Sequence, residues 1–233
     1  MTGEAALSRM VLSDQVKDHL LEAILDGRYP PGARIVETRV ARELGTSQAP
    51  VREALRDLEA LGLVETAAFR GARVRHPSTD ELLEAFVVRS QLESLAATLA
   101  VERLTAADLD QLTGFLGEMR RAARAGDLHA EAVADAGFHG LIVEISGNAM
   151  LRRVWQLLEP LSRTYITLVA PGADRHRIAD LHQPVLDALR ARDDARAADA
   201  LDHHYTAVGT MLASLWADER PPTAAPQPIE GNR

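Results

Sequence analysis

The 233-residue chain contains no cysteine, which excludes disulfide bonds and metal sites built from thiolates. It also lacks any apolar run of the roughly 18 residues that a membrane-spanning helix needs. The N-terminal stretch, residues 1–7, has neither the basic region nor the long apolar core of a secretory signal peptide. These absences predict a cytoplasmic protein with no membrane partner, and the 46% of apolar residues predicts a globular chain.

Charge is distributed unevenly along the chain. Residues 1–77 hold 11 basic and 11 acidic side chains, whereas the remainder holds 15 and 23 and so carries the whole net charge of −8. Between Arg28 and Arg75, nine arginines stand against six acidic residues. Because DNA binding depends on local phosphate contacts and not on the charge of the whole chain, this stretch is compatible with a nucleic-acid partner.

The first 77 residues predict three helices followed by a pair of strands. Ser13 is the expected N-cap of the first helix, and Gly27 is its expected end. The expected helices span residues 12–26, 37–44 and 49–61, and the expected strands span residues 63–65 and 72–75. This is the element order of a winged helix-turn-helix domain with a two-stranded wing.

The third expected helix separates apolar positions from arginine-bearing ones. Its apolar side consists of Val51, Leu55, Leu58 and Leu61, and its polar side carries Gln48, Arg52 and Arg56. Arginine can read guanine with two hydrogen bonds, and glutamine can read adenine in the same way. Arg39 on the second helix suits a phosphate contact, and Arg70 with Gly71 at the wing tip suits a minor groove. The alternative is that these arginines only solubilise a surface helix beside its glutamates.

Residues 78–220 predict an all-helical unit. Ser78 or Thr79 caps a helix that reaches about Arg103. Further helical segments span residues 105–125, 127–146, 148–169, 174–191 and 194–217. We therefore expect a mostly α protein, with a winged helix-turn-helix domain over residues 1–77, an antiparallel bundle of six to seven helices over 78–220 and a disordered, proline-rich tail over 221–233.

A group of metal-ligating residue types lies in the helical unit. Asp135 and His139 are four residues apart on one expected helix, so both side chains point the same way and can bind one ion. His182 and His204 lie on the last two expected helices. Three imidazoles and a carboxylate suit Zn²⁺, Mn²⁺ or Ni²⁺ and leave coordination positions for an oxygen ligand. Taken one at a time, such histidines are more often packed or surface residues.

Two further side chains are candidates for contact with a small molecule. Arg89 is expected to face the core with Leu92 and Ala96, where its guanidinium could bind an organic carboxylate. An i,i+4 salt bridge from Arg89 to Glu93 is an equal alternative. Asn148 stands before the next expected helix and most simply caps it, with direct ligand contact as the alternative.

Several short stretches resemble the winged helix-turn-helix domain of the GntR family. They are Pro30-Pro31-Gly32, Thr46–Leu55, Leu58-Glu59, Gly62-Leu63-Val64 and Arg70–Val74, in the family's order and spacing across residues 10–77. The resemblance implies that Arg39, Arg52 and Gly71 contact DNA. The full set of predicted DNA contacts is Arg39, Ser47, Gln48, Ala49, Arg52, Arg56, Arg70 and Gly71. Family members commonly carry arginine where this chain has Gln48, so we expect an operator sequence that departs from the usual one.

Residues 80–217 are similar to the all-helical FCD effector domain of the family's FadR branch. The matching pieces are Arg89-x-x-Leu92-Glu93, Asp135-x-x-Phe138-His139, Ser146-Gly147-Asn148, the stretch His182–Asp193, and His204, which lies 22 residues after His182. In that family an aspartate and three histidines hold a divalent metal ion, which implies Asp135, His139, His182 and His204 here. The spacing selects His204 over its neighbour His203. Pro184 predicts that a helix starts or bends near His182.

The function predicted from these features is a ligand-responsive transcription regulator and not an enzyme. The protein would bind double-stranded operator DNA as a homodimer, because one recognition helix reads only a half-site. The resemblance implies a carboxylate effector, an organic or sugar acid, and repression that this ligand relieves. Two alternatives remain at this point. One is a metal-dependent hydrolase whose His₃Asp site activates water, and the other is a sensor of the metal ion itself.

Overall fold

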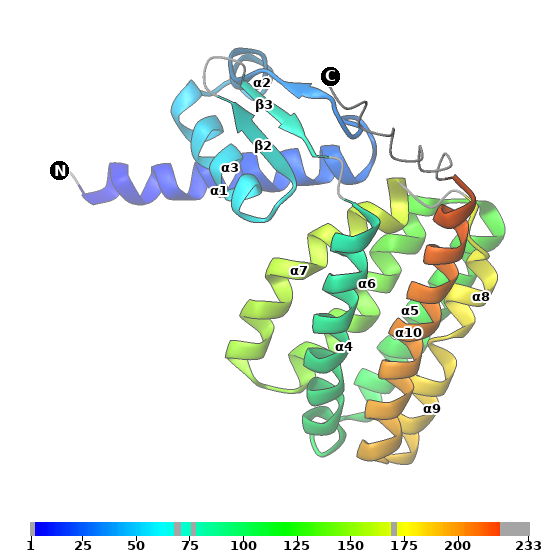
Figure 1. The fold of residues 1–233 in the computed structure, drawn as a ribbon. Helices are drawn as coiled ribbons and strands as arrows, with labels where there is room; N and C mark the ends of the chain where they lie inside the picture. The colour runs from blue at the N-terminus through cyan, green and yellow to red at the C-terminus, as the bar shows by residue number, and fades with distance from the viewer. Residues whose placement is uncertain (1–2, 68–70, 76–77, 169–171, 220–233) are drawn as a thin grey trace, which may run out of the picture.

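A computed structural model of the chain describes residues 3–67, 71–75, 78–168 and 172–219. The elements of the N-terminal unit are α1 (Gly3–Leu25), β1 (Arg34–Ile35), α2 (Glu37–Glu43), α3 (Gln48–Ala60), β2 (Val64–Ala67) and β3 (Gly71–Val74). Those of the C-terminal unit are α4 (Thr79–Val101), α5 (Ala106–Ala125), α6 (Leu128–Ile145), α7 (Ala149–Leu168), α8 (Arg175–Asp180), α9 (Gln183–Ala191) and α10 (Asp194–Glu219). Figure 1 shows the small α/β unit lying against one end of the helical bundle. Within these ranges, no helix is long and apolar enough to cross a membrane.

The N-terminal unit is a winged helix-turn-helix domain around its own core. Its strands form one antiparallel sheet in the order β1-β3-β2 (Figure 1), in which Ile35 pairs with Ala72 and Val64 with Val74. The buried side of this sheet packs with Leu20 of α1 and Leu58 of α3, both of which are fully buried. Burial of each such leucine contributes roughly 1.5–3 kcal/mol. The apolar side of α3 is thereby fixed inward and its polar side outward.

The N-terminal unit differs from the sequence prediction in two places. The sheet has three strands, because Arg34 and Ile35 pair with β3 and extend the expected two-stranded wing. Two residues are too short a segment to show alternation in a sequence. The first helix begins at Gly3 and not at Leu12, so Ser13 lies inside α1 and does not cap it. Residues 4–7 contain alanine, leucine and glutamate, which favour continuation of the helix.

The C-terminal unit is a bundle whose described part contains seven helices, within the expected six to seven. α4 and α10 run side by side through the bundle, and α5 packs along α6 (Figure 1). The expected segment 174–191 is divided into α8 and α9 at His182, and Pro184 stands in the first turn of α9. Proline there has no amide hydrogen to donate and costs the helix nothing. The predicted tail over residues 221–233 and Arg70 at the wing tip lie outside the described residues.

The start of α4 connects the two units. Ser78 is the N-cap of α4, as one of the two expected alternatives, and forms a capping box with Glu81. The other oxygen of Glu81 accepts a hydrogen bond of 2.7 Å from Nη2 of Arg75, the residue after β3. Arg75 Nη1 also donates to the carbonyl of Gly62. The end of the wing is therefore bonded to the first turn of the helix that carries Arg89 and Glu93.

Candidate DNA interface and metal centre

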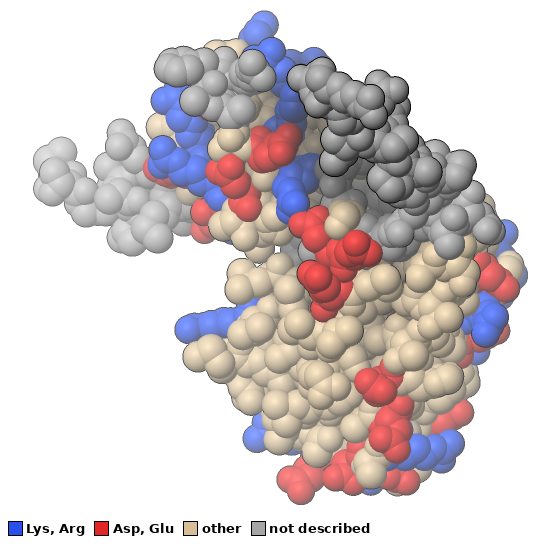
Figure 2. All heavy atoms as spheres, viewed as in Figure 1, with Lys and Arg blue, Asp and Glu red and all other residues tan. Residues whose placement is uncertain are grey.

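The outward side of α3 and the residues before it form one exposed surface. Ser47, Gln48, Ala49, Arg52 and Arg56 are all exposed, as is Arg39 on α2. On the face shown in Figure 2, basic side chains gather on the N-terminal unit, whereas a broad part of the bundle is uncharged. The Ser47 side chain makes no capping hydrogen bond, so its hydroxyl and the first amides of α3 lie at an exposed helix N-terminus, which is an anion-binding arrangement.

Arg52 is held in place by side chains of both helices. Its Nε donates to Oε2 of Glu37 at 2.6 Å, and its Nη2 donates to Oε1 of Gln48 at 3.1 Å. Arg39 pairs with Glu43 at 2.8 Å. Sequence reasoning did not identify Glu37 as a partner, because the two residues are 15 positions apart and only the turn between α2 and α3 brings them together. These acidic partners orient the two arginines on the exposed surface. A DNA contact by either arginine stays a prediction.

Gly71 begins β3 beside the wing tip, where it pairs with Ala67. Its φ is +77°, in the left-handed region that side-chain-bearing residues rarely adopt. A Cβ at this position would meet the Ile35 carbonyl oxygen only at an ordinary contact distance of 3.5 Å, so the backbone conformation is what favours glycine. Glycine is therefore required here by the turn. A DNA contact by Gly71 stays a prediction.

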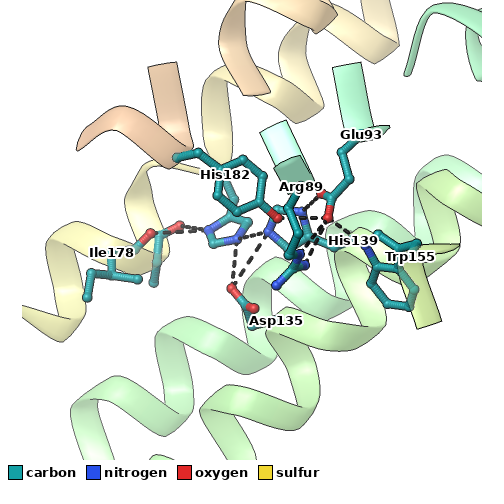
Figure 3. A network of polar contacts seen from close by, with 9 residues as sticks. Arg89, Glu93, Asp135, His139, Trp155, Ile178 and His182 are labelled. Atoms are coloured by element: carbon teal, nitrogen blue, oxygen red, sulfur yellow. Dashed lines mark hydrogen bonds and ion pairs between the residues drawn. The ribbon is translucent and has the colours of Figure 1, made fainter. Parts of the chain in front are cut away.

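In the bundle, the four sequence-predicted ligand residues converge on one point. Asp135 and His139 come from α6, His182 from the start of α9 and His204 from α10. One donor atom from each of the four residues lies within 4.8 Å of every other, and all four side chains are buried. His182 Nε2 is 3.1 Å from Asp135 Oδ1 and 3.1 Å from His139 Nε2 (Figure 3). Four donors this close in a dry interior match the ligand set of a divalent cation.

Hydrogen bonds orient two of the imidazoles toward that point. His139 Nδ1 lies 2.5 Å from Glu93 Oε2, and His182 Nδ1 lies 3.1 Å from the Ile178 carbonyl oxygen (Figure 3). Acceptors at both Nδ1 atoms place the proton there and leave both Nε2 lone pairs directed at the cluster. His204 Nδ1 is buried and, among the described residues, has no hydrogen-bond partner. A buried lone pair of this kind is what a metal ligand presents.

The electrostatics of the cluster favour metal-binding protonation states. Burial opposes ionisation of Asp135, but its interactions with the neighbouring His139 and His182 rings hold the pKa of Asp135 well below its ordinary value. Burial, together with repulsion from His182 and His139, lowers the pKa of His204 well below that of a free histidine. The site thus offers an ionised carboxylate and a neutral imidazole, which are the forms that coordinate a cation.

Glu93 of α4 contacts His139 and three further side chains through its two carboxylate oxygens. It is fully buried, and its Oε1 accepts hydrogen bonds from Arg89 (2.9 and 3.0 Å), Trp155 (2.5 Å) and Tyr205 (2.7 Å). Burial opposes its charge, yet His139 and Arg89 hold the pKa of Glu93 far below its usual range. Sequence reasoning placed Glu93 only as a possible partner of Arg89. Its contacts with His139, Trp155 and Tyr205 span 46 to 112 residues and carry no local signal.

Arg89 and Asn148 each make the contact that was the alternative to ligand binding. Arg89 is 2% exposed and forms the buried i,i+4 salt bridge with Glu93, and its guanidinium carbon lies 5.5 and 5.3 Å from the centroids of the Trp155 and Tyr205 rings. Asn148 Oδ1 accepts the backbone amides of Met150 and Leu151 and caps α7. Direct contact of either side chain with a small molecule stays a prediction.

Comparison with known proteins identifies both units. Residues 12–74 match the family described as "Bacterial regulatory proteins, gntR family", and residues 84–207 match the FCD domain. A probable D-xylose utilization operon transcriptional repressor of Paenarthrobacter nicotinovorans is 37% identical over 86% of this chain and 88% of its own length. The gluconate operon transcriptional repressor of Bacillus subtilis is 25% identical, with 92% and 90% covered.

A solved structure agrees with these matches. Escherichia coli McbR/YncC superimposes with a TM-score of 0.75 at 27% identity and covers 88% of this chain and 98% of its own. A DNA-reading unit joined to an effector domain accounts for the whole described fold, including the N-terminal third that a hydrolase would leave without a role. The chain belongs to the GntR family of DNA-binding transcription regulators, in the group that carries an FCD effector domain, and it is not an enzyme.

Proposed function

We propose that this regulator is a homodimeric repressor that dissociates from its operator DNA when a small carboxylic acid binds at a divalent metal centre. The observation that carries this proposal is the convergence of Asp135, His139, His182 and His204 within 4.8 Å in the interior of the FCD domain. Relatives of this chain bear the names of repressors of xylose, gluconate and galactonate operons, which supports a sugar-derived acid as the effector. A protein that acts on operator DNA works in the cytoplasm.

The donor set is chemically suited to Zn²⁺, Mn²⁺ or Ni²⁺. Imidazole and carboxylate ligands are used by all three ions, and the absence of thiolates gives no preference for a softer one. A bound ion would supply a positive centre with positions left for oxygen atoms of an effector. Glu93 and the Ile178 carbonyl keep the His139 and His182 rings aimed at that centre. Because the Arg89 charge is already paired with Glu93, the ion is the stronger attractor for a carboxylate.

The path from effector to DNA runs through α4. This helix carries Glu93, which bonds to His139, and its first turn carries Glu81, which bonds to Arg75 at the end of the wing. A ligand that binds two arrangements of these helices with different affinity shifts the population between them. Two-fold symmetry of a dimer would place two α3 helices on paired half-sites of the operator.

The proposal is tested with the DNA upstream of the protein's own gene, by fluorescence anisotropy with metal-loaded protein. We expect specific binding that weakens with salt, because phosphate contacts release counterions. Addition of aldonic acids is expected to lower operator affinity. Absence of specific binding at any salt concentration would contradict the proposal. A change of affinity with the ion alone, and none with any acid, would identify a metal sensor instead.

The clearest single test of the DNA interface is Arg52→Ala. We expect operator binding to weaken by about 1–3 kcal/mol, because Arg52 is presented on the exposed side of α3 and oriented by Glu37 and Gln48. The variant should fold normally, since the side chain is exposed. Arg124→Ala, at an exposed position of α5 in the other unit, removes the same charge and is expected to leave affinity unchanged. Equal operator affinity of the two variants would show that Arg52 does not contribute to DNA binding.

A further inference from the structure

A third polar side chain lies on α6 in line with the metal-ligand cluster. Glu131 precedes Asp135 by four residues and His139 by eight, so the three occupy successive turns on one face of the helix. Glu131 is 2% exposed. Burial, opposed by the charge of Arg175 and helped by the negative charge of Asp135, raises the pKa of Glu131 to about 7. Glu131 therefore interacts electrostatically with Asp135 of the metal-ligand cluster.

Arg175 lies opposite Glu131, close enough for an ion pair but not for a direct hydrogen bond. It is the first residue of α8, is 9% exposed, and its Nη1 is 3.8 Å from Glu131 Oε2, which is too long for a hydrogen bond. The segment from α8 to the start of α9 thus sets Arg175 against Glu131 in the same way that it sets His182 against Asp135. The two pairs are successive steps along α6.

The carboxylate of Glu131 has unmet hydrogen-bonding capacity. Among the described residues, neither Oε1 nor Oε2 accepts a hydrogen bond, although both atoms are buried. Buried carboxylates nearly always have partners, because an unmet acceptor in the interior is costly. A hydroxyl group fits the chemistry of this pair, since it can donate to a carboxylate and accept from a guanidinium at the same time. A second carboxylate fits poorly, because Glu131 already offsets the charge of Arg175.

We propose that Glu131 and Arg175 form a hydroxyl-recognition subsite one helical turn from the metal centre, which selects a polyhydroxylated acid over an acid of equal length without those hydroxyls. This inference rests on the proposed function, in which the carboxylate end of the effector binds the ion. One turn of α6 advances about 5.4 Å, a length that a short carbon chain spans. A hydroxyl further along the chain then reaches Glu131 and Arg175. The effector class is accordingly an aldonic acid.

The test is isothermal titration calorimetry on the metal-loaded, full-length protein with matched pairs of acids. The pairs are threonate with 2-hydroxybutanoate, xylonate with 2-hydroxypentanoate, and gluconate with 2-hydroxyhexanoate. Both members of a pair carry the same hydroxy-carboxylate head, and only the aldonate carries further hydroxyls. We expect at least one aldonate to bind about tenfold or more tightly than its partner, since a site built to bond a hydroxyl rejects the analogue without it.

Variants assign the preference to the two residues. Glu131→Met and Arg175→Met should each remove most of the preference and leave the affinity of the 2-hydroxy acid unchanged. Because either single variant removes one member of a buried charge pair, the double variant keeps the test valid if a single one misfolds. Glu144→Met, at an exposed position of the same helix, is the control and should keep the preference.

The outcomes separate this inference from the function on which it rests. Equal affinities within every pair, or a preference that persists in the double variant, would overturn the subsite alone. No binding of any acid would overturn both the subsite and the acid effector of the proposed function. The titrations contain no DNA, so they are decided by acid affinities alone. Failure of the protein to bind operator DNA would instead contradict the proposed function. Intact operator and metal binding beside equal acid affinities would leave that function standing without the subsite.

Discussion

His204→Ala is expected to remove the metal ion from the protein, whereas His203→Ala is expected to leave it bound. The two histidines are neighbours in α10, but His204 is 3% exposed and converges with the other three ligand residues, while His203 is exposed. Loss of one of four ligands should weaken binding by more than the roughly 10–100-fold that follows loss of a group hydrogen-bonded to a ligand. Both substitutions replace a histidine of α10 with alanine, so the change in helix propensity and the loss of an imidazole are the same in the two variants. A difference in metal content between them therefore reports metal ligation alone.

Metal content after gel filtration and the melting temperature with and without a chelator measure this difference. An ion that binds only the folded state stabilises it by about 2.7 kcal/mol at a free concentration of 100 times its Kd. The unmodified protein and the His203→Ala variant should therefore melt at a lower temperature after chelation. The His204→Ala variant should not respond. Equal metal content in the two variants would show that His204 is not a ligand.

The ligand residues differ in how far sequence alone could assign them. The spacing of Asp135 and His139 predicts a shared helix face directly, because four residues are about one turn. His182 and His204 lie 43 and 65 residues beyond His139, on separate elements, so only resemblance to a family places them beside it. The choice between His203 and His204 follows from that spacing. The structure has His204 buried in the cluster and His203 exposed.

What sequence could not predict is the set of contacts behind the ligands. The spacing of Arg89 and Glu93 predicts their salt bridge as one alternative, but nothing local indicates that Glu93 also meets Trp155 and Tyr205. The same holds for Glu131 and Arg175, which are 44 residues apart and come together only because α8 folds back on α6. Most helix bounds were predictable from caps and glycines, except the start of α1 and the division between α8 and α9, whereas the pairing of buried charges depends on tertiary packing.

Glu93→Gln is expected to damage both stability and metal binding. A carboxylate accepts at both oxygens, whereas a glutamine amide presents a donor on one side. In either orientation that donor would face existing donors, either His139 Nδ1 or the group formed by Arg89, Trp155 and Tyr205. The Arg89 charge would also be left buried without its partner, which costs about 3–5 kcal/mol in comparable cases. Metal affinity should fall by about 10–100-fold, because His139 is no longer held in the metal-binding tautomer.

Two further variants separate these effects. Tyr205→Phe removes one hydrogen bond to Glu93 and leaves its charge, so it should lower the free energy of unfolding by about 1.5–3 kcal/mol with metal affinity nearly intact. Arg89→Met combined with Glu93→Leu buries neither charge and should recover much of the stability lost in Glu93→Gln. Its metal affinity should stay low, because His139 Nδ1 still lacks an acceptor. Urea unfolding and metal titration of each variant measure the two quantities. Recovery of metal affinity together with stability would mean that Glu93 acts only on folding and does not position His139.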